Sequence, residues 1–426
     1  MFQFKFGFAT ALTSLQGIST LCRYGLDGDT GASSHEALRC LANAFLLNEP
    51  SRQIFVDLQY ATKAAERLKS GDLDDEFLLC RILFLLTYNT NVNFVMLADK
   101  HGLTESINQC ITHHSTAFSK SGRRKSRTSP IEEMAMVEAL KLMFNVTHFN
   151  PELTPNFTPS IEPLVNILVH YHLPSPPLQS PITYILNALL NLDLSSAEKK
   201  TPIGREAKTS PLFPYSTPEK VVDRMGAILF KAMKEHPERD LDEGAATLIT
   251  LLRRLYEIAS PQMKSWMRWL LLPNEKDRDQ PLGKGDTLSA RLLQLSTSPS
   301  VPNLRENISS LLFELSDKDA NKFVENIGYG FAAGFLMNNK IEVPKNAAEA
   351  SSSTRDGGAD VNPITGQRWS AEDKQKADLP EMTEEEKERE AERLFVLFER
   401  LRATGVVDIK NPVQQAIDEG RFEELD

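Results

Sequence analysis

The chain has 426 residues, of which 41% are apolar and 25% charged, a composition that excludes fibrous and wholly disordered chains. Its 48 basic and 58 acidic side chains leave a net charge of −10. This balance argues against a general nucleic-acid binder, which needs a basic surface to displace counterions from phosphates. The length fits one elongated domain or two to three compact ones.

No segment predicts a membrane span or a secretory signal. The longest apolar run, residues 77–88, is short and carries Arg81. The first eight residues contain one basic side chain, Lys5, and lead to no small-residue cleavage site. The four cysteines are scattered, without a Cys-x-x-Cys pair, so we expect reduced thiols that fill the core of a cytosolic or nuclear chain.

Apart from phenylalanines alternating at positions 2–8, apolar residues recur with helical spacing, and glycine and proline separate the helical stretches. Six segments share one frame and predict an internal repeat, namely residues 37–43, 81–87, 139–145, 185–191, 251–257 and 308–314. Their last positions lie 44, 58, 46, 66 and 57 residues apart. Armadillo and HEAT units run to roughly 40–47 residues, and loops near residues 115–130, 195–218 and 274–285 lengthen the longer intervals. The sequence therefore predicts an all-α, armadillo/HEAT-like right-handed superhelix over residues 1–340.

The last position of each segment and the position four residues earlier share one helix face. Three of the six last positions hold asparagine, whose amide can satisfy the backbone of a bound segment. We predict a partner-binding groove in which cations face a carboxylate-ended peptide and amides hold its backbone. Its residues are Arg39, Lys141 and Arg253, with Asn43, Asn145, Asn187 and Asn191. Two alternatives stay open: the face is merely solvated, or the asparagines satisfy loop backbones of their own repeats.

The composition changes near residue 340. Residues 341–380 contain few large apolar side chains and predict a disordered linker. Residues 381–426 hold 14 acidic and 7 basic side chains and predict an acidic amphipathic helix, which begins at a capping box on Thr383 and ends by Gly405. The apolar stripe of this helix includes Leu394, Phe395, Phe398 and Leu401. The helix either caps the repeats or binds a partner, and the sequence leaves both open.

No residue pattern predicts catalysis, a cofactor or a metal site. The segment Gly-Tyr-Gly-Phe-Ala-Ala-Gly at 328–334 has the wrong spacing for a dinucleotide fingerprint, and no strand precedes it. His113 and His114 are adjacent, which is not the spacing of metal ligands. The basic cluster at 120–127 is most simply a solvated loop. We therefore expect a binding protein that is not an enzyme and does not itself bind nucleotide.

Several segments, in order along the chain, resemble the synembryn family. They are residues 36–43 with Asn48-Glu-Pro50, residues 81–87, residues 142–147, residues 328–334, Asn362-Pro-Ile-Thr-Gly366, and residues 382–391. The resemblance extends from about residue 10 to 425 and is strongest to the fungal branch. It implies a guanine-nucleotide exchange factor and folding chaperone for heterotrimeric G-protein α subunits. The concave face would hold the C-terminal helix of the α subunit, and the chain's own C-terminal helix would reach the switch region.

The resemblance also assigns residues. Asn43 matches a groove asparagine of the family, and Phe395 and Phe398 fall on its tail helix. Family members usually have a further repeat, with groove arginines, before the point where this chain starts, and residues 347–360 lack the acidic phosphorylated segment of the animal members. The resemblance implies a cytoplasmic monomer that reaches the membrane periphery only through its α subunit. The alternative is an armadillo-type scaffold that binds basic peptides without exchange activity, and its groove should be acidic.

Overall fold

The computed structural model describes residues 11–28, 30–119, 129–198, 210–342, 361–362 and 364–377, with five further positions between 389 and 396. The chain divides into two compact units, residues 1–367 and residues 368–426. Every regular element in the described ranges is a helix, which confirms the all-α prediction. Among these helices, none has both the length and the apolar character that crossing a bilayer requires.

The first half of the repeat unit contains α2 (Leu15–Cys22), the π-helical turn η1 (Arg23–Asp27), α3 (Ala32–Leu47), α4 (Pro50–Asp57), α5 (Tyr60–Arg67), η2 (Leu68–Ser70), α6 (Leu73–Leu86), α7 (Phe94–His101), α8 (Leu103–Ser119) and α9 (Pro130–Phe149). The second half contains η3 (Pro151–Ser160), α10 (Ile161–His170), α11 (Ile182–Asn191), η4 (Leu194–Glu198), α12 (Lys220–Glu235), η5 (Glu238–Asp240), α13 (Leu241–Ile258), α14 (Pro261–Leu271), η6 (Asp277–Asp279), α15 (Leu288–Ser296), α16 (Pro302–Leu315), α17 (Ala320–Ile327) and α18 (Tyr329–Asn338). The second unit contains α20 (Trp369–Ala377).

Local sequence signals set the starts of the helices that matter most for the site. Helix α9 begins at a capping box, in which Ser129 Oγ accepts from the Glu132 backbone N–H and Glu132 Oε2 accepts from the Ser129 N–H. Helix α6 begins at Asp72, whose carboxylate accepts from the backbone N–H of Asp75 at 3.0 Å. The Asp75 side chain is 1% exposed and accepts from Arg67 Nε at 2.9 Å. This buried ion pair fixes α5 against α6.

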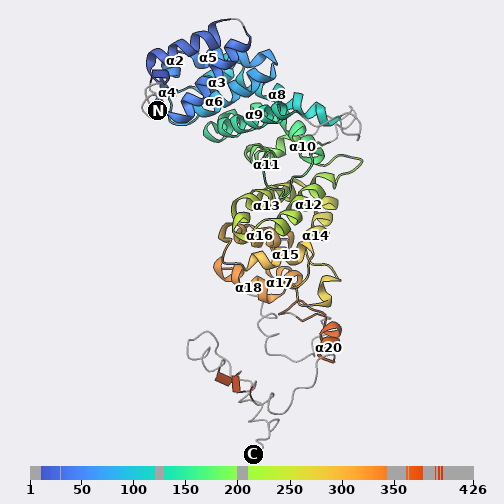
Figure 1. Ribbon diagram of the computed structural model, residues 1–426. Coiled ribbons are helices and arrows are strands. Elements are labelled where there is room, and N and C mark those ends of the chain that lie inside the picture. Colours follow the sequence, from blue (N-terminus) through green and yellow to red (C-terminus); the bar gives the residue numbers. More distant parts are fainter. Residues whose placement is uncertain are drawn as a thin grey trace, which may run out of the picture. The chain divides into compact units, whose positions relative to one another are not determined.

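The six segments of the sequence frame all lie on helices of one continuous row. Helix α3 packs against α6, α6 against α9, α9 against α11, α11 against α13, and α13 against α16. We call these six helices the inner row. A second layer runs beside it through α8, α10, α12 and α15, each of which packs on the next. Figure 1 shows the two layers as neighbouring columns, with α9, α11, α13 and α16 in one and α8, α10 and α12 in the other. The predicted helical repeat is therefore confirmed.

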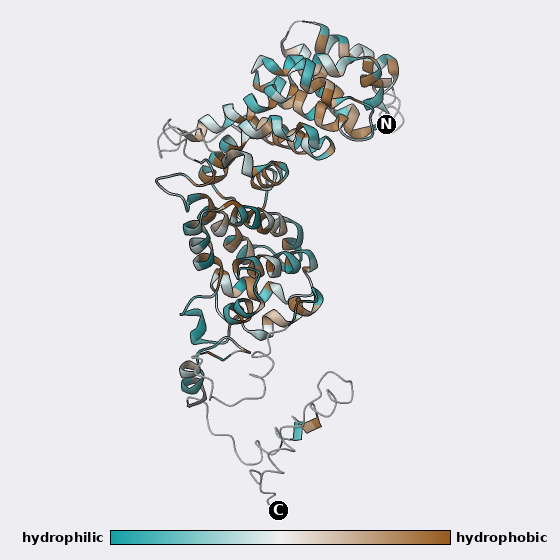
Figure 2. Cartoon of the chain, turned by 180° about the vertical axis from the view of Figure 1, so that it is seen from behind, coloured by the Kyte–Doolittle hydropathy of each residue, from teal (hydrophilic) through white to brown (hydrophobic). Residues whose placement is uncertain are grey.

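The positions that the frame assigned to the core are buried. These are the apolar side chains two and five residues before the last position of each segment, and they are buried on every helix for which the prediction was made. They are Leu38, Leu41, Ile82, Leu85, Leu140, Met143, Leu186, Leu189, Leu252 and Leu255. They form one continuous core between the layers, and apolar colouring follows the packed faces of the helices in Figure 2. Burial of this apolar stripe is what stabilises each repeat against its neighbours.

Residues 361–362 and 364–367 form a turn that packs on the last helices of the repeat unit, and we call it the docked turn. Asn362 closes it, because its backbone carbonyl accepts from the Gly366 N–H at 2.8 Å. The N–H of Gly330 donates to Ile364 O, and the N–H of Leu282 donates to Thr365 O, both at 3.1 Å. Gly328 has φ of 79°, and a Cβ there would lie 2.9 Å from Ile364 O. The glycine-rich segment at 328–334 therefore lets the backbone of the docked turn pack closely against it.

Arg278 joins the docked turn to the end of α17. Its guanidinium donates to Gly366 O and to the carbonyls of Glu325 and Asn326, each at 3.0 Å. The sequence placed this turn inside a disordered linker, because the turn has few large apolar side chains. In the structure the turn is held in place by hydrogen bonds to backbone groups. Amino-acid composition gives no sign of such bonds.

Several other predictions fall partly or wholly outside the described residues. Leu394, Phe398 and Leu401 lie outside them, as do residues 343–360 of the predicted linker and most of the basic cluster at 120–127. Phe395 is described as a half-buried helical residue. The proposed roles of the C-terminal helix remain predictions.

Candidate partner-binding surface

Helix α3 presents the most accessible part of the predicted groove. The Arg39 side chain is 47% exposed and lies 3.6 Å from Glu36 and 3.9 Å from Asp74, so its ion pairs are loose. Asn43, one turn further on, is exposed. Both side chains can reach a ligand without breaking a strong contact, because exposed ion pairs of this length contribute little to stability.

Helix α9 contributes one accessible and one buried side chain. Lys141 is half-buried, with Nζ 3.0 Å from Glu138 and 5.1 Å from the centroid of the Tyr184 ring. Asn145 is only 3% exposed, and its Nδ2 donates to Thr87 Oγ1 on α6 at 2.7 Å. The Asn145 amide therefore joins two helices of the inner row, and the expectation that it directly contacts a partner's backbone is corrected by this burial.

Helix α11 repeats this interhelical use of asparagine. Asn191 Nδ2 donates to Phe144 O and to Thr147 Oγ1 on α9, both at 3.1 Å. Asn187, one turn earlier, is half-buried, and among the described residues its side chain has no hydrogen-bond partner. Of the two amides on this helix, Asn187 is the one left available to a ligand.

The C-terminal end of the inner row is closed by an ion pair. Arg253 on α13 pairs with Glu314 on α16 through Nη2 at 2.7 Å and Nε at 3.1 Å, and its Nη1 donates to Asn307 Oδ1 at 3.2 Å. The neighbouring Arg254 caps the end of α11 by donating to the carbonyls of Leu190 and Leu192. Burial lowers the pKa of Arg254. Arg253 therefore lies on the inner row, but Glu314 neutralises its charge.

The predicted residues accordingly lie on four helices of one row, α3, α9, α11 and α13, and differ in what they can do. Arg39, Asn43, Lys141 and Asn187 are wholly or partly accessible, whereas Asn145, Asn191 and Arg253 connect one helix to the next. The alternative in which asparagines satisfy loop backbones of their own repeats does not describe Asn145 and Asn191, because their amides donate to two threonine hydroxyls and a helix carbonyl of the preceding repeat.

The sequence reasoning missed an apolar edge beside the row. The C-terminal ends of α3, α6 and α9 expose Leu46, Leu47, Tyr88 and Phe149. The Tyr88 and Phe149 rings lie edge to face, with centroids 6.0 Å apart. The available signal was the position of these side chains, which follow the last frame position by one to four residues and have no place in the core stripe.

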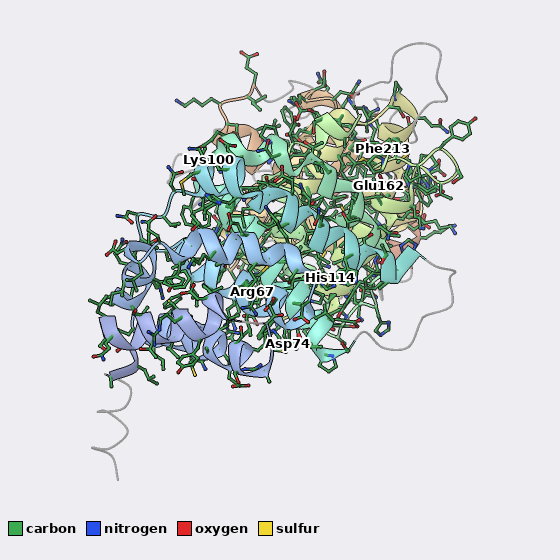
Figure 3. The ribbon with its side chains drawn as sticks, turned by 90° about the horizontal axis from the view of Figure 1, so that it is seen from above. Arg67, Asp74, Lys100, His114, Glu162 and Phe213 are labelled. Atoms are coloured by element: carbon green, nitrogen blue, oxygen red, sulfur yellow. The ribbon has the colours of Figure 1, made fainter. Side chains whose placement is uncertain are left out.

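Two groups of side chains have the ligand types that metals use. Within each group the ligand atoms lie within 4.8 Å of one another, and the members are Glu76, His113 and His114 in one group and His35, Asp72 and Asp74 in the other. His114 is bonded to Glu76 at 2.7 Å, and His35 to Asp75 at 3.0 Å. Each pair joins two different helices, so an interhelical link accounts for the geometry. Figure 3 looks along the stack from its N-terminal end and labels Asp74 and His114.

An all-α stack of helices that pack in two neighbouring layers defines a helical-repeat protein of the armadillo/HEAT kind. The model of one family, described as guanine nucleotide exchange factor synembryn, matches residues 7–421. The chain belongs to this family.

Individual curated proteins that resemble this chain share only about a quarter of the aligned residues with it. A synembryn-like chaperone of Schizosaccharomyces pombe is 28% identical over 377 residues, which cover 82% of this chain and 66% of that protein. The chaperone Ric-8A of Macaca fascicularis is 24% identical over 434 residues, covering 93% of this chain and 78% of that protein. Among solved structures, a designed armadillo repeat protein aligns with a TM-score of 0.40 at 10% identity, covering 70% of this chain and 99% of its own.

Proposed function

We propose that this chain is a guanine-nucleotide exchange factor and folding chaperone for a G-protein α subunit. The observation that carries the proposal is the family match over residues 7–421. The inner row supports it, because Arg39, Asn43, Lys141 and Asn187 lie on helices α3, α9 and α11 of that row and are wholly or partly exposed. We further propose that the chain acts as a cytoplasmic monomer and reaches the membrane periphery only through its α subunit.

The mechanism needs no covalent chemistry. An α subunit holds its nucleotide partly through the loop that leads into its last helix. A surface that binds this helix better when it is detached shifts the α subunit toward an open, nucleotide-free state. Coupling of a few tens-fold needs a difference of about 2 kcal/mol between the two affinities. The predicted C-terminal helix, with Leu394, Phe395, Phe398 and Leu401, would add a second, apolar contact at the switch region.

Release of GDP from a purified α subunit, measured with and without the chain, tests the proposal. We expect faster release with the wild-type chain and none of that acceleration with the double variant Arg39→Glu/Asn43→Asp. Both side chains are exposed, so the double variant should keep the thermal stability of the wild type. An unchanged release rate with the wild-type chain would favour the scaffold alternative. An unchanged dissociation constant in the double variant would refute the assignment of the α3 end to the partner.

A further inference from the structure

An aromatic hollow lies away from the proposed groove, between α14 and the segment that enters α12. Trp266 and Trp269 line it from α14, and Pro218 and Glu219 line it from the other side. The two indole rings are 4.8 Å apart between centroids and inclined by 37°. The hollow is open to the surface and has a volume of about 390 Å³, which is within the roughly 300–1,000 Å³ of ligand sites in proteins. Helices α12 and α14 appear together at one side of the stack in Figure 1.

The two tryptophans have different surroundings. Trp266 is held in place, because its Nε1–H donates to Asp223 Oδ1 on α12 at 2.8 Å. Trp269 is 62% exposed, which is unusual for the largest apolar side chain. An oriented indole therefore lies beside a second indole that is largely open to solvent.

Glu219 supplies the charge of the hollow. Its side chain is half-buried, and within the described residues it makes no ion pair or hydrogen bond. A carboxylate that no cation of the described residues engages can pair with a cationic ligand. The faces of the indole rings attract cations as well, because their quadrupole is negative there.

We propose that this hollow binds an arginine side chain from a partner protein. A planar guanidinium can stack on an exposed indole such as that of Trp269 and form two parallel hydrogen bonds to a carboxylate, which an ammonium cannot do. A proline-rich segment could also use the indoles, but it would leave Glu219 uncompensated. The charge complementarity therefore favours arginine, and the contact is independent of the proposed exchange activity.

Binding of a labelled peptide to the full chain tests the proposal. The probe is a fluorescein-labelled peptide of four Gly-Arg repeats, followed by anisotropy at 150 mM salt, with a citrulline peptide as its neutral counterpart of the same shape. We expect saturable binding of the arginine peptide and at least tenfold weaker binding of the citrulline peptide. Trp269→Ala should weaken arginine-peptide binding at least tenfold, and Glu219→Gln about three- to tenfold.

The control for overall charge is Glu243→Gln, an exposed carboxylate in the first turn of α13. A chain of net charge −10 attracts any basic peptide, so equal weakening by Glu219→Gln and Glu243→Gln would overturn the proposal. Equal affinity for the arginine and citrulline peptides would also overturn the proposal. It would be overturned as well if the chain bound phosphatidylcholine vesicles through Trp269 and did not bind the peptide. Tighter peptide binding after all Lys and Arg of residues 199–209 are replaced by Ser, if Trp269→Ala abolishes the gain, would assign the hollow to the chain's own loop instead.

Discussion

Replacing Arg278 with alanine isolates the force that holds the docked turn on the repeats. The guanidinium makes one hydrogen bond to the turn, at Gly366 O, and two to the end of α17. A hydrogen bond with one charged partner contributes about 1.5–3 kcal/mol. The bonds that Gly330 and Leu282 donate to the turn would remain. The substitution should therefore weaken docking by about 2 kcal/mol, or roughly 30-fold in the equilibrium constant.

Native-state hydrogen exchange measures this change directly, because the Leu282 and Gly330 amides lose their acceptors only when the turn opens. We expect both amides to exchange roughly 30-fold faster in Arg278→Ala, while amides inside α13 and α16 keep their rates. Arg291→Ala is the matched control, since Arg291 also donates to a backbone carbonyl, that of Met233, but does not touch the turn. Unchanged exchange at both Leu282 and Gly330 would refute the role assigned to Arg278.

Three further changes test the packing of the repeats. Asn145→Ala should lower the free energy of unfolding by about 1 kcal/mol, because it removes the hydrogen bond to Thr87 Oγ1, which keeps its own bond to Phe84 O. Asn43→Ala should leave the free energy of unfolding unchanged in urea titrations, and equal effects of the two substitutions would contradict the difference in burial. Asp75→Asn should cost about 3–5 kcal/mol by leaving the α5 guanidinium without its buried counter-charge, and a loss below 1 kcal/mol in the same titration would show that the pair is dispensable. Only the exposed Cys40 should react with Ellman's reagent at pH 8. Burial raises the pKa of Cys22 to about 12, which keeps that thiol protonated and unreactive. Rapid labelling that survives Cys40→Ala would be inconsistent with this core.

The fold could be predicted because its determinants are local. Apolar residues such as Leu38 and Leu41 recur with helical spacing, and the capping signals at Ser129 and Asp72 mark where helices begin. Each repeat buries its stripe against its immediate neighbours, so the pattern within one segment already determines most of the packing.

The use of each polar side chain could not be predicted in the same way. Asn43 and Asn145 occupy the same frame position, but Asn145 faces a threonine on the preceding helix and is covered, whereas Asn43 is exposed. Only the packing of the helices decides between these outcomes. The docked turn escaped prediction for a related reason, because Gly328 and Arg278 act on backbone groups that are distant in sequence.

The two ends of the inner row differ in the charge that they offer to a ligand. At α3 the guanidinium of Arg39 is half exposed and its counter-ions lie 3.6–3.9 Å away. At α13 the guanidinium of Arg253 is engaged by both oxygens of Glu314. If a ligand carboxylate separated Arg253 from Glu314, it would also meet the freed Glu314 carboxylate. Repulsion from Glu314 would then offset the attraction to Arg253. For the proposed partner helix, this asymmetry favours placing the terminal carboxylate at α3 and the amide-held backbone toward Asn187, because the one strongly accessible cation of the predicted set lies at that end.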